Sequence, residues 1–301
     1  MTAEQVRSKI SAAIREAISI PLKSSDDVEQ FLQKLPFHIR GSYGGNTSCV
    51  EIGAGDAFVL CDAGTGLRDF GNHVMASGQG VGKEYHIFLS HPHWDHIQGF
   101  PFFVPAYVPG NRIHVYGFHD ALESVFQSQQ KPPAFPVPLE YMRAAKTFTV
   151  LEPDREYEVA GFRVKGIKQS HPGDSYGYSF EKEGKKIVYA TDSEYKEDVW
   201  DDDRKVVSFF RDADLLIFDA QYSFLDSAHV KENWGHSSNL LGIELSIAGN
   251  VKHLCLFHNE PACNDEELDR FLQDSRNYLQ IYAETSPLKI DLAFDGMELD
   301  I

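Results

Sequence analysis

The stretch Ser90-His91-Pro92-His93-Trp94-Asp95-His96 decides how this sequence of 301 residues is interpreted. It follows an apolar run, residues 85–89, that is typical of a buried strand, so it begins where that strand ends. Three imidazoles and one carboxylate therefore lie within six residues of one another on a tight loop. Neutral imidazole and ionised carboxylate are side chains that bind zinc, manganese and iron.

The spacing within this loop predicts two metal ions. In an extended stretch His91 and His93 project to the same side, so both can contact one ion. Asp95 and His96 then turn towards a second ion. One loop cannot complete two coordination shells, so further ligands must come from elsewhere in the chain.

Three further candidate ligands end a strand-like run or lie just beyond one: His171, Asp192 and His258. A carboxylate can place one oxygen on each of two ions, so Asp192 is a candidate bridge. Taken alone, Asp192 would equally suit a helix cap, and His258 would equally suit a buried, hydrogen-bonded histidine. Their positions after the first motif favour the ligand interpretation.

The rest of the chain alternates β-rich runs with helical patterns. The strand-like runs cover residues 48–52, 57–62, 86–90, 112–116, 176–181, 186–190, 215–219, 254–258 and 289–294. Helical patterns cover 66–77, 237–248 and 265–282, and Asn264 and Glu267 suit the cap and third positions of the last helix. This order predicts an α/β fold with two mixed sheets and helices outside them, in one catalytic domain of residues 37–301.

Residues 1–36 are predicted to form a separate helical extension. An apolar stripe recurs at every fourth position of the first helix: Val6, Ile10, Ile14 and Ile18. Thr2 and Gln5 suit a capping box at its start, and Ser25 is expected to cap a second helix that Pro36 ends. These helices either pack on the body of the protein or form a homodimer contact or a lid.

The charge of the sequence limits the expected partners. Lysine and arginine number 28 against 45 aspartate and glutamate residues, which gives a formal net charge of −17. A protein that grips a nucleic-acid backbone usually carries a basic face, and an acidic surface repels long polyanions. We therefore expect a small substrate.

Cysteine usage and hydropathy indicate the compartment. The four cysteines form no C-x-x-C pair, so a separate structural zinc site is not expected. The N-terminus is polar, and no apolar stretch approaches ~18 residues, so the sequence predicts neither a signal peptide nor a membrane span. A cytoplasmic protein with reduced thiols is predicted.

Over residues 37–294 the sequence resembles the metallo-β-lactamase superfamily. Its H-x-H-x-D-H motif is matched in full, and its later His, bridging Asp and final His are matched by His171, Asp192 and His258. The resemblance implies a four-layer αββα fold with two divalent ions, Zn²⁺ first and Mn²⁺ or Fe²⁺ as alternatives. It assigns one ion to His91, His93 and His171, the other to Asp95, His96 and His258, and Asp192 to both.

The resemblance also implies a role for Asp62, which follows a strand-like run. It matches an early aspartate of the family that orients the metal loop and is usually not a ligand.

His236 decides which branch of the family the sequence resembles. It lies in Trp234-Gly235-His236-Ser237-Ser238, at the expected start of a helix and ahead of His258. This arrangement resembles the phosphodiesterase branch, which includes ribonuclease Z and the cyclic phosphodiesterases of phosphonate use. In that branch the histidine faces the phosphate and assists the leaving oxygen. The run 219–222 also resembles this branch, whereas a histidine in a surface helix cap is the alternative.

Two departures from that branch matter. Ribonuclease Z carries a long tRNA-binding arm between its third-motif histidine and its bridging aspartate, whereas the interval from His171 to Asp192 is short and fits a plain hairpin. Processing of tRNA is therefore not expected. The cysteine ligands of the extra zinc in the phosphonate enzymes are also missing.

The sequence thus predicts a dinuclear-metal hydrolase, with His236 and Asp95 as catalytic residues and a small or cyclic phosphodiester as substrate. A hydrolase of a carboxylic ester, thioester or lactone with the same metals is one alternative. A non-catalytic metal-binding regulatory module is another. Four aromatic residues either line a nucleobase pocket or belong to the core: Phe102, Phe103, Phe135 and Tyr141.

Overall fold

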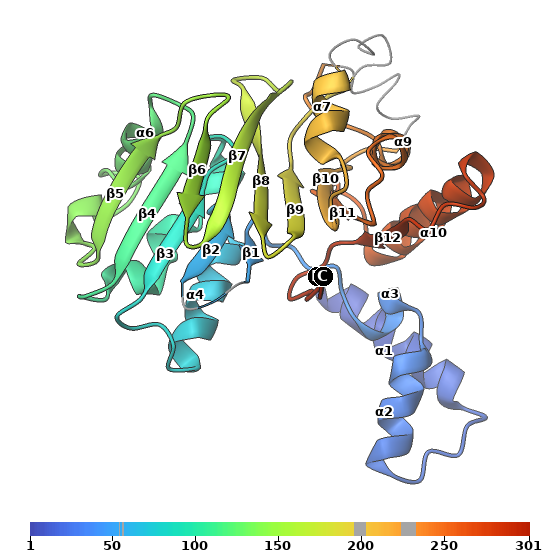
Figure 1. Cartoon of the computed structure of the whole chain (residues 1–301). Helices are drawn as coiled ribbons and strands as arrows, with labels where there is room; N and C mark the ends of the chain where they lie inside the picture. Colours follow the sequence, from blue (N-terminus) through green and yellow to red (C-terminus); the bar gives the residue numbers. More distant parts are fainter. Residues whose placement is uncertain (54, 56, 196–202, 224–232) are drawn as a thin grey trace.

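The computed structural model describes residues 1–53, 55, 57–195, 203–223 and 233–301 (Figure 1). In these residues the strands form two sheets. The first sheet has the order β1 (Val50–Ile52), β2 (Phe58–Cys61), β3 (Glu84–Phe88), β4 (Arg112–Gly117) and β5 (Ala145–Val150). The second has the order β12 (Lys289–Leu292), β11 (His253–Phe257), β10 (Leu215–Asp219), β9 (Lys185–Ala190), β8 (Ser175–Lys182), β7 (Phe162–Gln169) and β6 (Glu156–Val159).

Helices lie outside both sheets. Between the strands of the first sheet the chain forms three helices and three short 3₁₀ turns. The helices are α4 (Gly66–Ala76), α5 (Trp94–Ile97) and α6 (Leu122–Gln129), and the turns are Phe100–Phe102, Val104–Tyr107 and Leu139–Tyr141. The second sheet is accompanied by α7 (Asp203–Phe210), α9 (Asn239–Ala248) and α10 (Asp265–Tyr282). The chain begins with α1 (Ala3–Ala17), α2 (Ser25–Lys34) and α3 (Phe37–Arg40). No helix of the described residues is long and apolar enough to traverse a bilayer.

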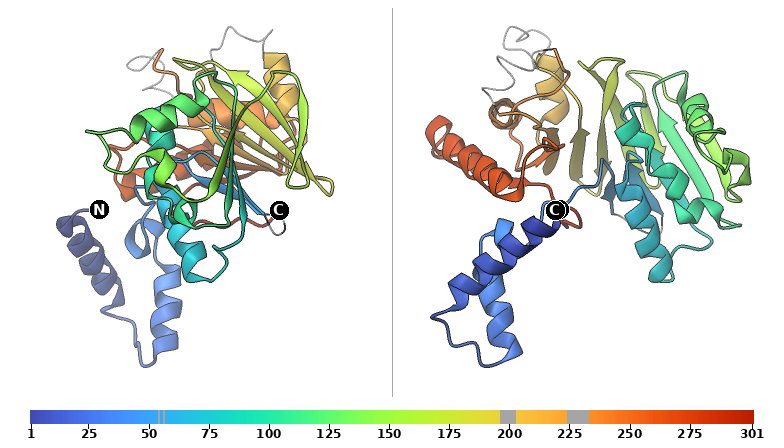
Figure 2. Two further views of the ribbon diagram at one scale, coloured as in Figure 1. Left: turned by 90° about the vertical axis from the view of Figure 1, so that its left-hand side faces the viewer. Right: turned by 180° about the vertical axis from the view of Figure 1, so that it is seen from behind.

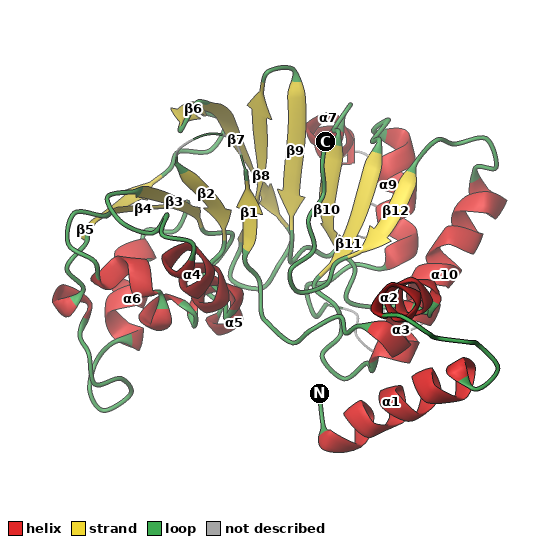
Figure 3. Cartoon of the chain, turned by 90° about the horizontal axis from the view of Figure 1, so that it is seen from below, coloured by secondary structure: helices red, strands yellow, loops and turns green. Residues whose placement is uncertain are grey.

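Three apolar clusters hold the layers together. Between the sheets, Phe88 of the first packs with Tyr178 and Phe180 of the second. Leu67 of α4 belongs to the cluster on the outer side of the first sheet, and Ile243 of α9 to the one on the outer side of the second. Figure 3 shows helices flanking the two sheets on opposite sides. The predicted four-layer αββα arrangement is therefore confirmed.

Most predicted elements are present, with small shifts at their ends. The capping boxes predicted at Thr2 and Asn264 are both formed. The expected cap at Ser25 is wrong by one residue: Ser24 is extended, and its hydroxyl accepts from the backbone of Asp27. The helix expected over 237–248 starts at Asn239, because the hydroxyl of Ser238 caps it. His236 therefore lies in the loop ahead of α9.

The direction of the strands positions the loops that carry the predicted site. Strands β2 to β5 are mutually parallel, and so are β9 to β12. Parallel neighbours end at the same edge of a sheet, so the residues after β2 and β3 lie together. The residues after β9, β10 and β11 do the same in the second sheet. The two edges supply most of the site.

Two glycines allow the histidine loop to pack against the loop after β2. The backbone N–H of Gly99 donates to Ala63 at 2.9 Å, and that of Ala63 donates to His96 at 2.8 Å. A Cβ added to Gly99 would lie 1.8 Å from the carbonyl oxygen of Gly64, and one added to Gly64 would lie 2.4 Å from that of Asp95. Only residues without a side chain fit this contact.

We predict that Gly99→Ala lowers the free energy of unfolding by roughly 1–3 kcal/mol or more, because the methyl group forces two backbone segments apart. Denaturant unfolding of the metal-free protein measures the change. Gly45→Ala is the matched control, since a Cβ there meets nothing within 4 Å. Equal stability of the two variants would show that the loop relaxes freely.

Candidate metal centre

The structure brings together all of the predicted ligand side chains. They come from the loop after β3, the turn before β8, and the residues after β9 and β11: His91, His93, Asp95, His96, His171, Asp192 and His258. Ligand atoms lie within 4.8 Å of one another in three overlapping groups: His91, His93 and His171; His91, His96 and Asp192; Asp95, His96 and His258. The first and third are the two groups that the family resemblance implies.

Asp192 lies between these groups. Its Oδ2 is 3.6 Å from Nε2 of His91 and 3.9 Å from Nε2 of His171. The same oxygen is 3.4 Å from Nε2 of His96, and Oδ1 is 3.5 Å from Nε2 of His258. Its side chain is only 3% exposed, so the carboxylate is almost entirely removed from bulk solvent. The carboxylate thus faces both groups, as a bridging ligand would.

The spacings of the ligand atoms fit a metal ion. Two ligands at 2.0–2.1 Å from a tetrahedral ion are about 3.3 Å apart. Oδ2 of Asp95 is 3.3 Å from Nε2 of His96 and 3.4 Å from Nε2 of His258. Nε2 of His171 is 3.1 Å from Nδ1 of His93.

Two imidazole nitrogens of the cluster have no hydrogen-bond partner. Nε2 of His91 and Nε2 of His96 are buried without a hydrogen-bond partner. A buried polar atom left in this state costs about 1–3 kcal/mol. A bound cation removes that cost, so the residues present fit the metal that the fold family implies.

Burial keeps the first group of histidines in the form that binds metal. Loss of solvation lowers the pKa of His91, His93 and His171, because the charged imidazolium is disfavoured away from water. At neutral pH these rings are uncharged. An ion can therefore bind them without first displacing a proton.

In the group of Asp95, His96 and His258, the carboxylates determine the direction of the histidine pKa shifts. Burial opposes protonation of His258, but the charge of Asp192 overrides it and raises the pKa of His258 to about 9. The pKa of His96 is raised in the same way, against burial, by Asp192 and Asp62. Burial favours the neutral acid at Asp95, yet the neighbouring imidazoles of His258 and His96, 3.4 and 3.3 Å away, hold its pKa well below the usual range. An ion bound here replaces protons as the partner of the carboxylates.

Asp62 holds the histidine loop in place through hydrogen bonds. It is fully buried and accepts four hydrogen bonds. Two come from the N–H and hydroxyl of Ser90, at 2.7 and 2.8 Å. The others involve Nδ1 of His96 at 2.7 Å and the hydroxyl of Tyr189 at 2.6 Å. Because Nδ1 of His96 is engaged, its Nε2 is turned towards Asp192, which is the geometry that the predicted orienting role requires.

His236 stands beside the cluster with its ring held by a buried carboxylate. Its ring lies 5.1 Å from that of His258 at an angle of 16°, and 5.3 Å from that of His171. Its Nδ1 is 2.9 Å from Oδ2 of Asp219, which is fully buried and also accepts from the N–H of Ser193. His236 also falls within ligand distance of two groups, with His171 and Asp192, and with Asp219 and His258.

Asp219 is the functional candidate that the sequence patterns do not single out. Within the run 219–222 only a general resemblance points to it. The available signal is that Asp219 ends β10 in the way that Asp192 follows β9, its parallel neighbour.

The core alternative applies to Phe103, one of the four aromatic residues. Phe103 is fully buried and packs against Tyr85 in the core, at 5.2 Å, so the pocket interpretation is wrong for this residue. Phe102 is 53% exposed, with its ring 5.5 Å from that of Phe135, and Tyr141 is 73% exposed.

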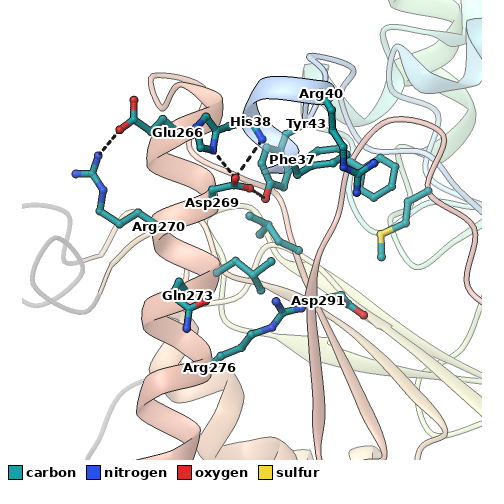
Figure 4. Close-up of a pocket in the computed structure, with 14 residues that line it drawn as sticks. Phe37, His38, Arg40, Tyr43, Glu266, Asp269, Arg270, Gln273, Arg276 and Asp291 are labelled. Atoms are coloured by element: carbon teal, nitrogen blue, oxygen red, sulfur yellow. Dashed lines mark hydrogen bonds and ion pairs between the residues drawn. The ribbon is translucent and has the colours of Figure 1, made fainter. Parts of the chain in front are cut away.

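A hollow of about 570 Å³ lies elsewhere, between α3, α10 and β12 (Figure 4). Arg40, Arg270 and Arg276 line it together with Glu266, Asp269 and Asp291, so its charges balance. None of the predicted ligands lines it.

The fold and this cluster define a hydrolase of the αββα class that binds divalent metal. Residues 58–258 match the family described as the beta-lactamase superfamily domain, and the chain belongs to that family. The ribonuclease Z of Thermoplasma acidophilum is 23% identical over 289 residues, covering 79% of this chain and 88% of that protein.

Solved structures share the fold. A diphosphatase from the PhnP family superposes with a TM-score of 0.60 at 20% identity, covering 94% of this chain and 92% of its own. Unliganded yeast PDE1 gives a TM-score of 0.66 at 13% identity, over 83% and 93% of the two chains.

We predict that Asp62→Asn weakens zinc binding by about 10–100-fold, because an amide cannot replace a carboxylate that accepts from four donors. Asparagine tolerates the left-handed backbone of this position, φ 63°, so the fold should persist. Competition with a chromophoric chelator measures affinity, and circular dichroism checks the fold. Tyr189→Phe removes one of the four donors and should have a smaller effect. An unchanged affinity in Asp62→Asn would remove the orienting role.

Proposed function

We propose that this protein is a phosphodiesterase that hydrolyses a small or cyclic phosphodiester with two divalent ions, Zn²⁺ by preference. The observation that carries the proposal is the His236–Asp219 pair, which presents an imidazole beside the metal-ligand cluster. The similarity to a ribonuclease Z and the fold shared with a PhnP-family diphosphatase support it.

In this proposal the ligands divide as the family resemblance implies. His91, His93 and His171 hold one ion, and Asp95, His96 and His258 hold the other. The carboxylate of Asp192 is shared, since it faces both groups. When bound, the ions supply an acidified water and positive charge against the phosphoryl oxygens.

The chain's own residues complete the chemistry. Nδ1 of His236 is held by Asp219, so Nε2 is the atom that can give a proton to the departing oxygen. With a proton on Nε2 the ring can still donate its Nδ1–H to the carboxylate of Asp219. Asp95, whose side chain is 41% exposed, remains accessible to water and is the candidate acceptor of its proton.

A small substrate fits the charge better than a long one. The net charge of −17 disfavours an extended polyanion. Between His171 and Asp192 the chain forms only the hairpin of β8 and β9, with no inserted arm. Cyclic nucleotides are therefore the first substrates to test, and precursor tRNA the contrasting one.

The decisive assay uses purified protein of measured metal content and a panel of esters. It contains bis(p-nitrophenyl) phosphate, 2′,3′- and 3′,5′-cyclic nucleotides, a precursor tRNA, a lactone and a thioester. Turnover of a small diester supports the proposal. Turnover of the lactone or thioester alone would replace it with carboxylic-ester chemistry, and preference for tRNA would overturn the small substrate. No turnover with both ions bound would favour a regulatory role.

We predict that Asp192→Ala loses metal together with activity, because the two ion positions lose their shared ligand. Metal analysis after gel filtration should give clearly fewer ions per chain than the wild type. Asp219→Asn is the control, since Asp219 contacts His236 and is not among the proposed ligands. Two ions retained in Asp192→Ala would exclude the bridge.

We predict that His236→Ala keeps its metal but loses about 10²–10⁴-fold in turnover of an alkyl phosphodiester, whose leaving oxygen needs a proton. A p-nitrophenyl ester departs without one and should lose much less. This difference separates a proton donor from a structural residue. Metal loss in the variant would instead make His236 a ligand, and equal losses on both esters would remove the proton-donor role.

A further inference from the structure

The first two helices stand clear of both sheets. Figures 1 and 2 show α1 and α2 projecting from the body near α10, which makes residues 1–36 an arm. α1 has no buried residue along its 15 positions, and α2 has one, Phe31. Apolar side chains on the arm therefore remain in contact with water.

α1 turns its apolar stripe away from its attachment. The partly covered positions of this helix are mostly small or polar: Lys9, Ser11, Ala12, Ala13 and Ala17. In contrast Ile10 is 55% exposed, Ile14 61% and Ile18 78%. Packing on the body, the simpler of the two roles that the sequence leaves open, therefore does not account for these isoleucines.

The base of the arm is firmly held by polar contacts. The ammonium of Lys9 lies 2.6 Å from the carboxylate of Asp265 and donates to the carbonyl of Gly41 at 2.8 Å. Next to it, His38 and Tyr43 converge on Asp269 of α10, at 2.6 and 2.5 Å, above the hollow seen in Figure 4. These contacts fix the arm while leaving its stripe exposed.

The second helix and the turn before it also expose apolar side chains. Val28 and Leu32, one turn apart on α2, are 40% and 37% exposed, and Ile20 between the helices is 44% exposed. A helix of this length is marginally stable in water unless its apolar face is covered. Several exposed apolar side chains gathered on one arm are typical of an interaction surface.

We propose that the arm is a dimerisation element whose apolar stripe packs on the arm of a second copy of this chain. Charge is the first argument for this partner. Residues 1–36 contain five basic and five acidic side chains, whereas the whole chain carries −17. Two such acidic bodies repel each other, and the arm is a neutral surface through which they can meet.

The two helices also complement each other. Lys9 is paired with Asp265, which leaves α1 two arginines, Arg7 and Arg15, and two acidic residues, whereas α2 has one basic and three acidic residues. A two-fold axis that sets α1 of one copy on α2 of the other can pair these arginines with the acidic residues of α2.

The test compares full-length proteins by gel filtration with light scattering over a range of concentrations. The wild type should be a dimer. Ile10→Glu/Ile14→Glu should be a monomer, with a dissociation constant raised about 100-fold or more, because four charges would enter the interface. Val81→Glu, an exposed valine on the body (60%), should leave the dimer unchanged. Circular dichroism and metal content check that each variant is folded.

Other outcomes overturn the proposal. A dimer that persists in the double variant would place the interface elsewhere. A wild type that stays monomeric at all concentrations would exclude a second copy as the occupant. If that monomer floats with anionic lipid vesicles and the double variant does not, the apolar stripe binds a membrane surface instead of a second copy.

Discussion

The site depends on one buried carboxylate set among imidazoles. Asp192 is almost fully enclosed and lies 3.4–3.9 Å from the nitrogens of His91, His96, His171 and His258. Hydrogen bonds to Asp62 and Gly235 orient two of these rings. A carboxylate removed from water is costly unless charge compensates it, and here protonated histidines or cations must do so. The demand for positive charge at this point is therefore built into the fold.

The direction of the strands brings the histidines to Asp192. Each sheet contributes parallel strands that end at the same edge, so residues far apart in the sequence become neighbours. The backbone at Asp62, Asp192 and His258 adopts positive φ, between 49° and 63°. Such values are uncommon outside glycine, and they occur here where the chain leaves a strand and turns its side chain into the site.

The sequence predicts that these side chains gather, because its signal is local. The histidine loop contains four candidate ligands within six residues, and the other candidates lie near apolar runs that are easily recognised as strands. The sequence did not predict strands β5 and β6, because they lie at the edges of their sheets and are largely exposed, so they lack an apolar run. Strand β7 starts with the apolar–polar alternation of a half-buried strand, but Gly166 interrupts this alternation after only four residues.

Two features needed the structure because they are long-range. Nothing in the sequence pairs His236 with Asp219, since the contact exists only where the loop before α9 passes the end of β10. Likewise the stripe of α1 is plain in the sequence, whereas its direction depends on the contacts of Lys9 with α10 and the segment after α3. Periodicity predicts that a helix has an apolar face but does not say what covers it.

The acidic surface and the cation-seeking centre together favour the small substrate proposed. Charges are screened beyond about 8 Å at physiological ionic strength. A small phosphodiester seated at the centre feels mainly the local positive charge of bound cations and protonated histidines. A long nucleic acid reaches well beyond that distance, over a surface that carries the net charge of −17. If the proposed function holds, electrostatics alone would favour a small substrate over a long one.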